Sequence, residues 1–216
     1  MAEFKIGRSS SSVGNLEPAA LAKDRVVITR DSILQWKLEG RVFYCQQGNA
    51  GTKLAVVVTA YNEDQPTLAI TVPEGLLMIP LSLNITLEDL AGTENHIIWS
   101  TTTNDIGAGT STVLTPVNYR RDNLFAPACK AYSIYSGDAT AATGLIEVHR
   151  WYHPFASALV TDGTDLHNHR WTIDDPDMPI LLGPATLQVH IYGTTTDPEG
   201  YGEYTWVELD AKELGL

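Results

Sequence analysis

Histidines are the residues of this chain whose types and spacing come nearest to a reactive site. They gather in two short segments, as His149 and His153 in H-R-W-Y-H and as His167 and His169 in H-N-H. On a strand, a His-x-His pair places both imidazole rings on one face, which is how a transition-metal site can begin. A cupin-type metal enzyme would also need a later histidine, for which His190 is available, and a glutamate just beyond the pair.

The residue expected beyond that pair does not fit a cupin. Between Trp171 and Asp174 the chain offers an aspartate in place of the glutamate. We therefore favour loop histidines in contact with water, or histidines packed about a trimer axis, over a metal-dependent β-barrel enzyme. The enzyme remains a third hypothesis, and it requires His167, His169 and His190 to converge in a cavity.

Aspartates form two further clusters, D-G-T-D at 162–165 and D-D-P-D at Asp174, Asp175 and Asp177. Calcium binds several oxygen ligands at once, and such loops can supply them. Neither cluster has the D-x-D-x-D-G spacing of a calcium loop, however, and Asp-Gly and Asp-Pro favour turns. We therefore predict turns here, and no resident metal or cofactor.

Motifs for nucleophilic catalysis or phosphate binding are not found in the sequence. There is no G-x-S-x-G elbow, and the glycines of 107–109 precede a predicted strand instead of a helix. Cys45 and Cys129 each follow apolar or aromatic residues, which favours buried thiols over a disulfide. Paired carboxylates for glycoside hydrolysis would meet only in space, so the sequence leaves them open. We predict no catalytic residues and no enzymatic activity.

Any such side chain would be positioned by β-strands. In the second half of the segment between Val72 and Glu88, apolar residues occupy odd positions and polar residues even ones, as in a long strand with one buried face. The apolar set is Leu77, Ile79, Leu81, Leu83, Ile85 and Leu87, and the polar set is Ser82, Asn84, Thr86 and Glu88. Pro80 has no N–H to donate, so it predicts a sheet edge or a β-bulge.

Short β-rich runs alternate with turn clusters along the rest of the chain. We predict strands near 25–30, 40–47, 52–61, 67–73, 76–88, 95–102, 111–118, 130–135, 144–152, 179–182, 185–194 and 202–209. Only 17–23, 32–38 and 211–214 have modest helical character. We predict an all-β, single jelly-roll-type antiparallel β-sandwich at 23–216, preceded by a Ser-rich, mobile N-terminal arm at 1–22.

Charge narrows the range of partners. The formal net charge is -12 and the pI is about 4.8, which opposes binding to phosphate backbones and anionic lipids. The sequence contains no apolar run of the roughly 20 residues that a membrane helix needs, and its first residues lack the apolar core of a signal peptide. We expect no direct contact with nucleic acid or membrane, and synthesis in a cytoplasm.

Aromatic residues raise one further question of function. Five of them lie near predicted loops or strand ends, namely Trp151, Tyr152, Trp171, Tyr201 and Tyr204. Rings in such places can stack on sugars or fill an oligomer interface. Core or interface packing is the interpretation we favour, and an exposed row would favour receptor binding.

Several segments together resemble the jelly-roll virion proteins of tailed and uncultivated bacteriophages. They are V-P-E-G at 72–75 leading into I-P-L at 79–81, S-G-D-A-T-A-A-T at 136–143, L-L-G-P at 181–184 and W-V-E-L at 206–209. Their order and spacing match over roughly residues 50–210. The resemblance implies a β-sandwich that trimerises on a capsid or within a fibre or spike, and it implies no catalytic residues. The H-N-H and D-D-P-D segment at 166–177 has no counterpart in that pattern.

The first hypothesis is therefore a homotrimeric decoration or accessory protein on the capsid exterior. Its partners would be further copies of itself and the major capsid protein or another virion protein, with the N-terminal arm extending over its neighbours. The second is a receptor- or carbohydrate-binding module of a fibre or spike, with a groove lined by Trp or Tyr.

Overall fold

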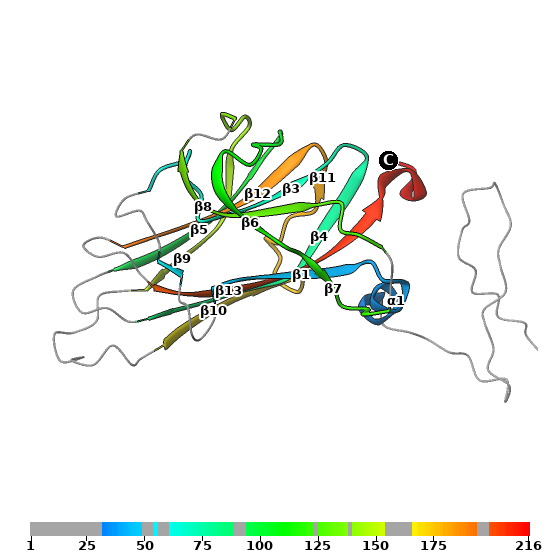
Figure 1. Ribbon diagram of the computed structural model, residues 1–216, viewed down its shortest axis with the longest axis horizontal. Helices are drawn as coiled ribbons and strands as arrows, with labels where there is room; N and C mark the ends of the chain where they lie inside the picture. Colours follow the sequence, from blue (N-terminus) through cyan, green and yellow to red (C-terminus); the bar gives the residue numbers. More distant parts are fainter. Residues whose placement is uncertain are drawn as a thin grey trace, which may run out of the picture.

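Two antiparallel sheets packed face to face make up the body of the molecule (Figure 1). The computed structural model describes residues 32–48, 54–55, 61–88, 94–122, 125–137, 140–153, 166–193 and 199–216. The predicted all-β sandwich is confirmed. The predicted arm at 1–22, the helix at 17–23 and the strand at 25–30 lie outside the described residues.

Each sheet draws its strands from distant parts of the chain. The first has the order β10-β4-β13-β1-β7, with β11 beside β4 and β2 beside β13. Its members are β1 (Val42–Gln47), β2 (Leu54–Ala55), β4 (Leu76–Glu88), β7 (Val117–Asn118), β10 (Leu166–Thr172), β11 (Leu181–Leu182) and β13 (Glu199–Asp210). We call it the seven-stranded sheet.

The second, six-stranded sheet has the order β6-β8-β3-β12-β5-β9. Its members are β3 (Leu68–Val72), β5 (Asn95–Thr102), β6 (Thr110–Leu114), β8 (Lys130–Gly137), β9 (Ile146–His153) and β12 (Ala185–Gly193). Helix α1 (Ser32–Glu39) and the 3-10 helix η1 (Ala211–Leu214) complete the described elements.

Eight strands pair in a nested order. β1 pairs with β13, β3 with β12, β4 with β10, and β5 with β9. This is the pairing of one long hairpin that has been rolled up, so that its strands are divided between the two sheets. The strands between β5 and β9 are added at the sides, where β8 extends the six-stranded sheet beside β3 and β7 extends the other sheet beside β1.

The main core fills the space between the sheets. Its four largest aromatic side chains are fully buried, and they are Trp99, Trp171, Trp206 and Tyr204. Leu, Ile and Val side chains from the inward faces of β3, β4, β5 and β12 surround them. Burial of so much apolar surface is the dominant favourable term in the folding free energy.

A β-bulge divides β4 into two halves. Ser82 faces Thr205 on β13, whereas Pro80 faces Trp206, so Leu81 is an extra residue on the β4 side. The predicted bulge at Pro80 is thereby confirmed, in a strand that lies inside its sheet and not at an edge.

The bulge changes which face of β4 is apolar. Beyond it, Leu83, Ile85 and Leu87 enter the main core, as predicted. Before it, Met78 enters the main core, and Leu77 and Leu81 lie in a separate cluster on the outer face of the sheet. The prediction of one buried face along the whole strand is therefore wrong for its first half, because one inserted residue reverses the alternation.

Helix α1 covers this outer apolar half. Ile33 and Trp36, three residues apart and therefore on one helix face, pack against an outer cluster. The outer cluster consists of Val42, Leu77, Leu81, Val207 and Leu209, with Ile79 and Ile173 beside it. The predicted helix at 32–38 is confirmed; it ends at Glu39 and is followed by Gly40, whose φ of 74° suits glycine.

Other strand predictions differ in detail. The predicted strand at 111–118 is two strands, β6 and β7, and only β2 of the strand predicted at 52–61 is described. The segment Leu166–Thr172 was predicted as a loop and is the strand β10. Its inward positions carry histidine and tryptophan, so the sequence pattern lacks the apolar alternation of an ordinary buried strand.

Candidate functional site

Two histidines from different sheets meet at one side of the sandwich. β9 and β10 are edge strands of the six- and seven-stranded sheets, and the Nε2 atoms of His149 and His169 are 3.2 Å apart. Trp171 stacks on His149, and Trp151 stacks on His169, with ring centroids 4.9 and 5.2 Å apart. We call His149, Trp151, His169, Trp171 and Asp177 the histidine latch, because it joins the edges of the two sheets.

Asp177 fixes the orientation of the latch. His149 Nδ1–H donates to Asp177 Oδ2 at 2.6 Å, and the indole N–H of Trp171 donates to Asp177 Oδ1 at 2.8 Å. Because an ionised carboxylate can only accept, Nδ1 of His149 carries a proton, and the Nε2 atoms of His149 and His169 share a hydrogen bond. The latch is thus a continuous chain from a carboxylate to a second imidazole.

Protonation of the latch is controlled by its surroundings. Burial, followed by the neighbouring charge of His149, lowers the pKa of His169 to about 4. Although burial acts to raise the pKa of Asp177, hydrogen bonds from Trp171 and His149 bring it below its ordinary value. Near pH 7 the latch therefore contains an ionised Asp177 and a neutral His169.

The histidines of the cupin hypothesis do not converge. His169 faces Ile85 of the main core across the β10–β4 pair. His190 lies on β12 between Val189 and Ile191, which both enter the main core, so its ring points to the opposite, outer face of the six-stranded sheet. His167 lies on β10 opposite Leu87. The prediction of loop histidines is wrong for His169, which is partly buried between the sheets.

His190 is buried on the outer face of the six-stranded sheet. It is 2% exposed, and its ring centroid is 5.0 Å from that of Tyr61. Burial lowers the pKa of His190 to about 4, and a backbone group of Asn62 opposes the shift only in part. The ring is therefore neutral near pH 7.

The aspartates of D-D-P-D form the turn that was predicted. Asp175 accepts hydrogen bonds from the backbone N–H of Thr172 at 2.7 Å and from its hydroxyl at 3.2 Å. Asp177 belongs to the latch, and Asp174 is exposed. The other cluster, at 162–165, lies outside the described residues. Among the residues that are described, no group of three or more His, Cys, Asp or Glu is placed to hold a metal ion.

Several predictions of core packing are confirmed. Trp171 and Tyr204 are fully buried, and Trp151 packs against the main core, whereas Tyr152 is exposed on β9. Both cysteines are buried and free. Burial raises the pKa of the Cys45 thiol to about 12, and burial with the nearby Glu208 carboxylate raises that of Cys129 further, so both are unreactive near neutral pH.

Exposed apolar side chains gather where β4 begins. β11 pairs with Leu77 and Met78, η1 is bonded to Gly75 by its Ala211 N–H, and Phe125 lines a hollow of about 310 Å³ together with Leu76. We call this surface the apolar end. Its exposed members are Phe125, Ile180, Leu182, Leu214 and Leu216, with 48–67% of their surface in contact with solvent.

Sequence reasoning missed the partners of the latch and the apolar end. His149 and His169 were noted in separate motifs, but their meeting depends on the two sheets being stacked. One sequence signal could have linked the two histidines. In both H-R-W at 149–151 and H-N-H-R-W at 167–171, a histidine and a tryptophan two residues later share one strand face.

Comparison with known proteins finds no relative of this chain. No family model, no curated protein and no solved structure matches the chain. In the part of the chain that the structure describes, no helix has the length and apolar character needed to cross a membrane.

Proposed function

We propose that this protein is a jelly-roll structural component of a bacteriophage particle, a homotrimer attached to the capsid exterior. The nested pairing of eight strands supports the jelly-roll part of the proposal, because that architecture is an eight-stranded double sheet built from Greek keys. Jelly rolls occur in viral capsids, lectins and cupins alike, so the strand order alone does not select the function.

The apolar end is the observation that supports assembly into a homotrimer. Phe125, Ile180 and Leu216 are each about two-thirds exposed and lie around the start of β4. Large apolar side chains that are exposed on neighbouring elements are typical of a protein interface. Contact between copies of the chain would remove these side chains from water, and a closed ring would use the surface in every subunit.

The particle context rests on the resemblance to phage virion proteins and on charge. A net charge of -12 suits the outside of a particle, away from the packaged genome. The mechanism is mechanical: subunits bury apolar surface against each other and against coat subunits, which raises the free energy needed to separate them. Partners are the protein itself and the major capsid protein or another virion protein.

Sedimentation velocity of the full chain tests the proposal. We expect a species of three times the 23.6 kDa chain mass at micromolar concentration. The double variant Ile180→Ser and Leu182→Ser should shift it to monomer, because the apolar contact is lost. The matched control, Val113→Ser and Ile146→Ser, changes residues that are 68% and 61% exposed on the six-stranded sheet and should leave the trimer intact. A monomeric wild type, or a double variant that stays trimeric, would contradict the proposal.

A further inference from the structure

A polar groove lies on the outer face of the seven-stranded sheet, beside α1. It has a volume of about 550 Å³, within the range of small-ligand sites. Its lining comes from α1, β1, β4, β10 and β13 and from Tyr119, just after β7. The β4 bulge creates it, because beyond Leu81 the outer face of β4 carries Ser82 and Asn84 in place of apolar side chains.

The floor of the groove offers both hydrogen-bond donors and acceptors. On three adjacent strands, Asn84 lies opposite Arg170 on one side and opposite Glu203 on the other. A cation, an amide and a carboxylate therefore form a row across the sheet, with neighbouring strands about 4.8 Å apart. The next row brings the hydroxyls of Ser82 and Thr205. Neither Arg170 nor Glu203 forms an ion pair with another described residue.

One acceptor in the floor lacks a partner. The side-chain oxygen of Asn84 is buried and accepts no hydrogen bond from any described residue. An unsatisfied buried acceptor destabilises a fold, so a donor from a water molecule or from a ligand that enters the groove would stabilise Asn84 there.

Two tyrosines form an aromatic wall. The ring centroids of Tyr44 and Tyr119 are 5.1 Å apart, and the Lys37 ammonium lies 5.1 Å from the Tyr119 ring. The Tyr119 hydroxyl is 3.4 Å from that of Thr205, so the wall is tied to the floor. An aromatic face beside polar groups matches a ligand with one C–H face and a rim of hydroxyls.

The chemistry of the groove excludes other ligand classes. A strand-forming peptide needs a free sheet edge, and the floor is centred on β4 and β13, whose backbones are paired on both sides. A nucleic acid or another polyanion would meet one carboxylate, two cations and a net charge of -12. An apolar partner would leave the amide, guanidinium and carboxylate of the floor without hydrogen bonds.

We propose that this groove binds an uncharged oligosaccharide, with a pyranose ring against Tyr119 and its hydroxyls on Asn84, Arg170 and Glu203. The proposal is independent of trimer formation, because the groove lies within one subunit and none of the exposed side chains of the apolar end lines it. On a virion exterior it would serve to bind a surface glycan of the host.

A printed array of neutral and acidic oligosaccharides, probed with the full chain, tests the proposal. We expect binding to neutral glycans, and calorimetry on the strongest one should give a weak 1:1 interaction. Tyr119→Ala should weaken it by about tenfold or more through loss of the stacking face. Tyr152→Ala is the matched control, since both tyrosines are 45% exposed, and it should bind as the wild type does.

Asn84→Ala separates a binding role from a structural one. It should weaken the glycan by about tenfold and leave the melting temperature unchanged or higher, because an unsatisfied acceptor is removed. No neutral glycan bound on the array, preference for acidic glycans alone, or unchanged affinity in both groove variants would overturn the proposal. Sedimentation velocity on the same samples reports the oligomeric state separately.

Discussion

The two outer faces of the sandwich differ in whether their polar side chains are open or covered. On the seven-stranded sheet, α1 covers the apolar half and leaves the polar half open as the groove. On the six-stranded sheet, residues 103–109 and 140–144 fold over a face that is polar as well. Its buried polar members include Ser100, Thr186, Gln188 and His190.

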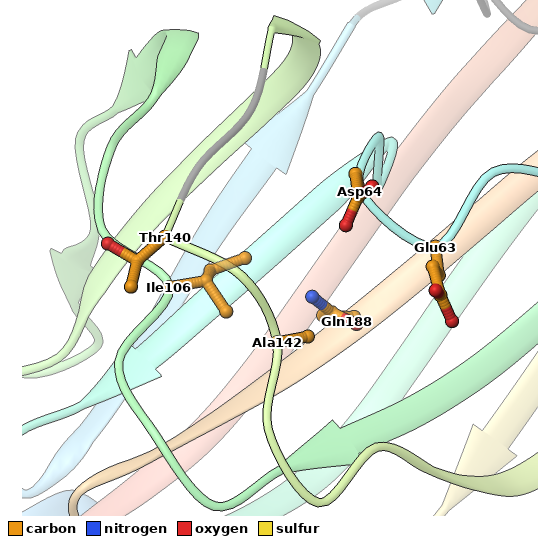
Figure 2. A pocket seen from close by; sticks show the side chains of 6 residues that line it. All are labelled: Glu63, Asp64, Ile106, Thr140, Ala142 and Gln188. Carbon is orange, nitrogen blue, oxygen red and sulfur yellow. The ribbon is translucent and has the colours of Figure 1, made fainter.

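The covered face satisfies most of its polar groups internally. Thr186 donates its hydroxyl hydrogen to the carbonyl of Asn104 at 2.8 Å, and Ser100 donates to Gln188 at 3.3 Å. Figure 2 shows Gln188 on the strand, with Ile106 and Ala142 in the covering segments, around a hollow of about 10 Å³. That space holds about one water molecule. The comparison teaches that a polar sheet face can be covered by segments of the same chain or left open to water and ligands, and the groove is the open case.

The largest effect should come from deleting Leu81, which removes the bulge that separates the two halves of the seven-stranded face. Without the extra residue, Leu83, Ile85 and Leu87 would point outward, and the main core would lose their side chains. We expect no cooperative unfolding transition by circular dichroism. Pro80→Ala keeps the residue count and should fold. A deletion variant that melts as the wild type does would refute the role of the bulge.

Acid should destabilise the six-stranded face through His190. The pKa of His190 is lowered to about 4 by burial, so the unfolded chain binds a proton between about pH 6.5 and 4 and the native state does not. The contribution of His190 to the free energy of unfolding is therefore fully present above pH 6.5. It falls as the pH drops to about 4, by up to about 1.4 kcal/mol per pH unit.

Urea unfolding of the wild type and of His190→Leu at several pH values measures this slope. The variant should lose the contribution of His190 and keep that of His169, whose pKa is also lowered to about 4. Equal slopes in the two proteins between pH 6.5 and 4 would count against a neutral, buried His190.

The smallest of these effects should come from Thr186→Val, which loosens the lid over the six-stranded face. The substitution removes the hydroxyl that donates to Asn104 and accepts from the Ile106 N–H at 3.3 Å. We expect a loss of about 1 to 2 kcal/mol in the free energy of unfolding by urea. The same change at exposed Thr112 on β6 is the control and should be nearly neutral. If both variants have equal stability, the lid is not held by Thr186.

Local patterns in the sequence predicted most strands but not the contacts between strands of different sheets. β4, β12 and β13 follow from their alternating apolar and polar residues, and Pro80 indicated the bulge. The sequence could not say that the bulge reverses the faces of β4, because either side of a bulged strand can be buried. β10 was missed because its inward residues His169 and Trp171 are stabilised by stacking and hydrogen bonds to another sheet.

The groove was beyond prediction for a similar reason. Tyr44, Asn84 and Arg170 are each unremarkable in their own segments, and Arg170 lies 126 positions after Tyr44. Only the nested pairing brings their strands side by side. Local signals in a sequence describe one strand at a time, whereas a site on a sheet face depends on the strand order.

That strand order also has a consequence for biosynthesis. β13 lies at the centre of the seven-stranded sheet, between β1 and β4, yet it leaves the ribosome after both. The sheet therefore cannot close until translation has passed Asp210, and until then β1 and β4 each expose a strand edge of unpaired backbone N–H and C=O groups, with which another nascent chain could pair. Slow emergence of these last residues should favour aggregation, and chaperones that shield unpaired strands should raise the yield of native protein.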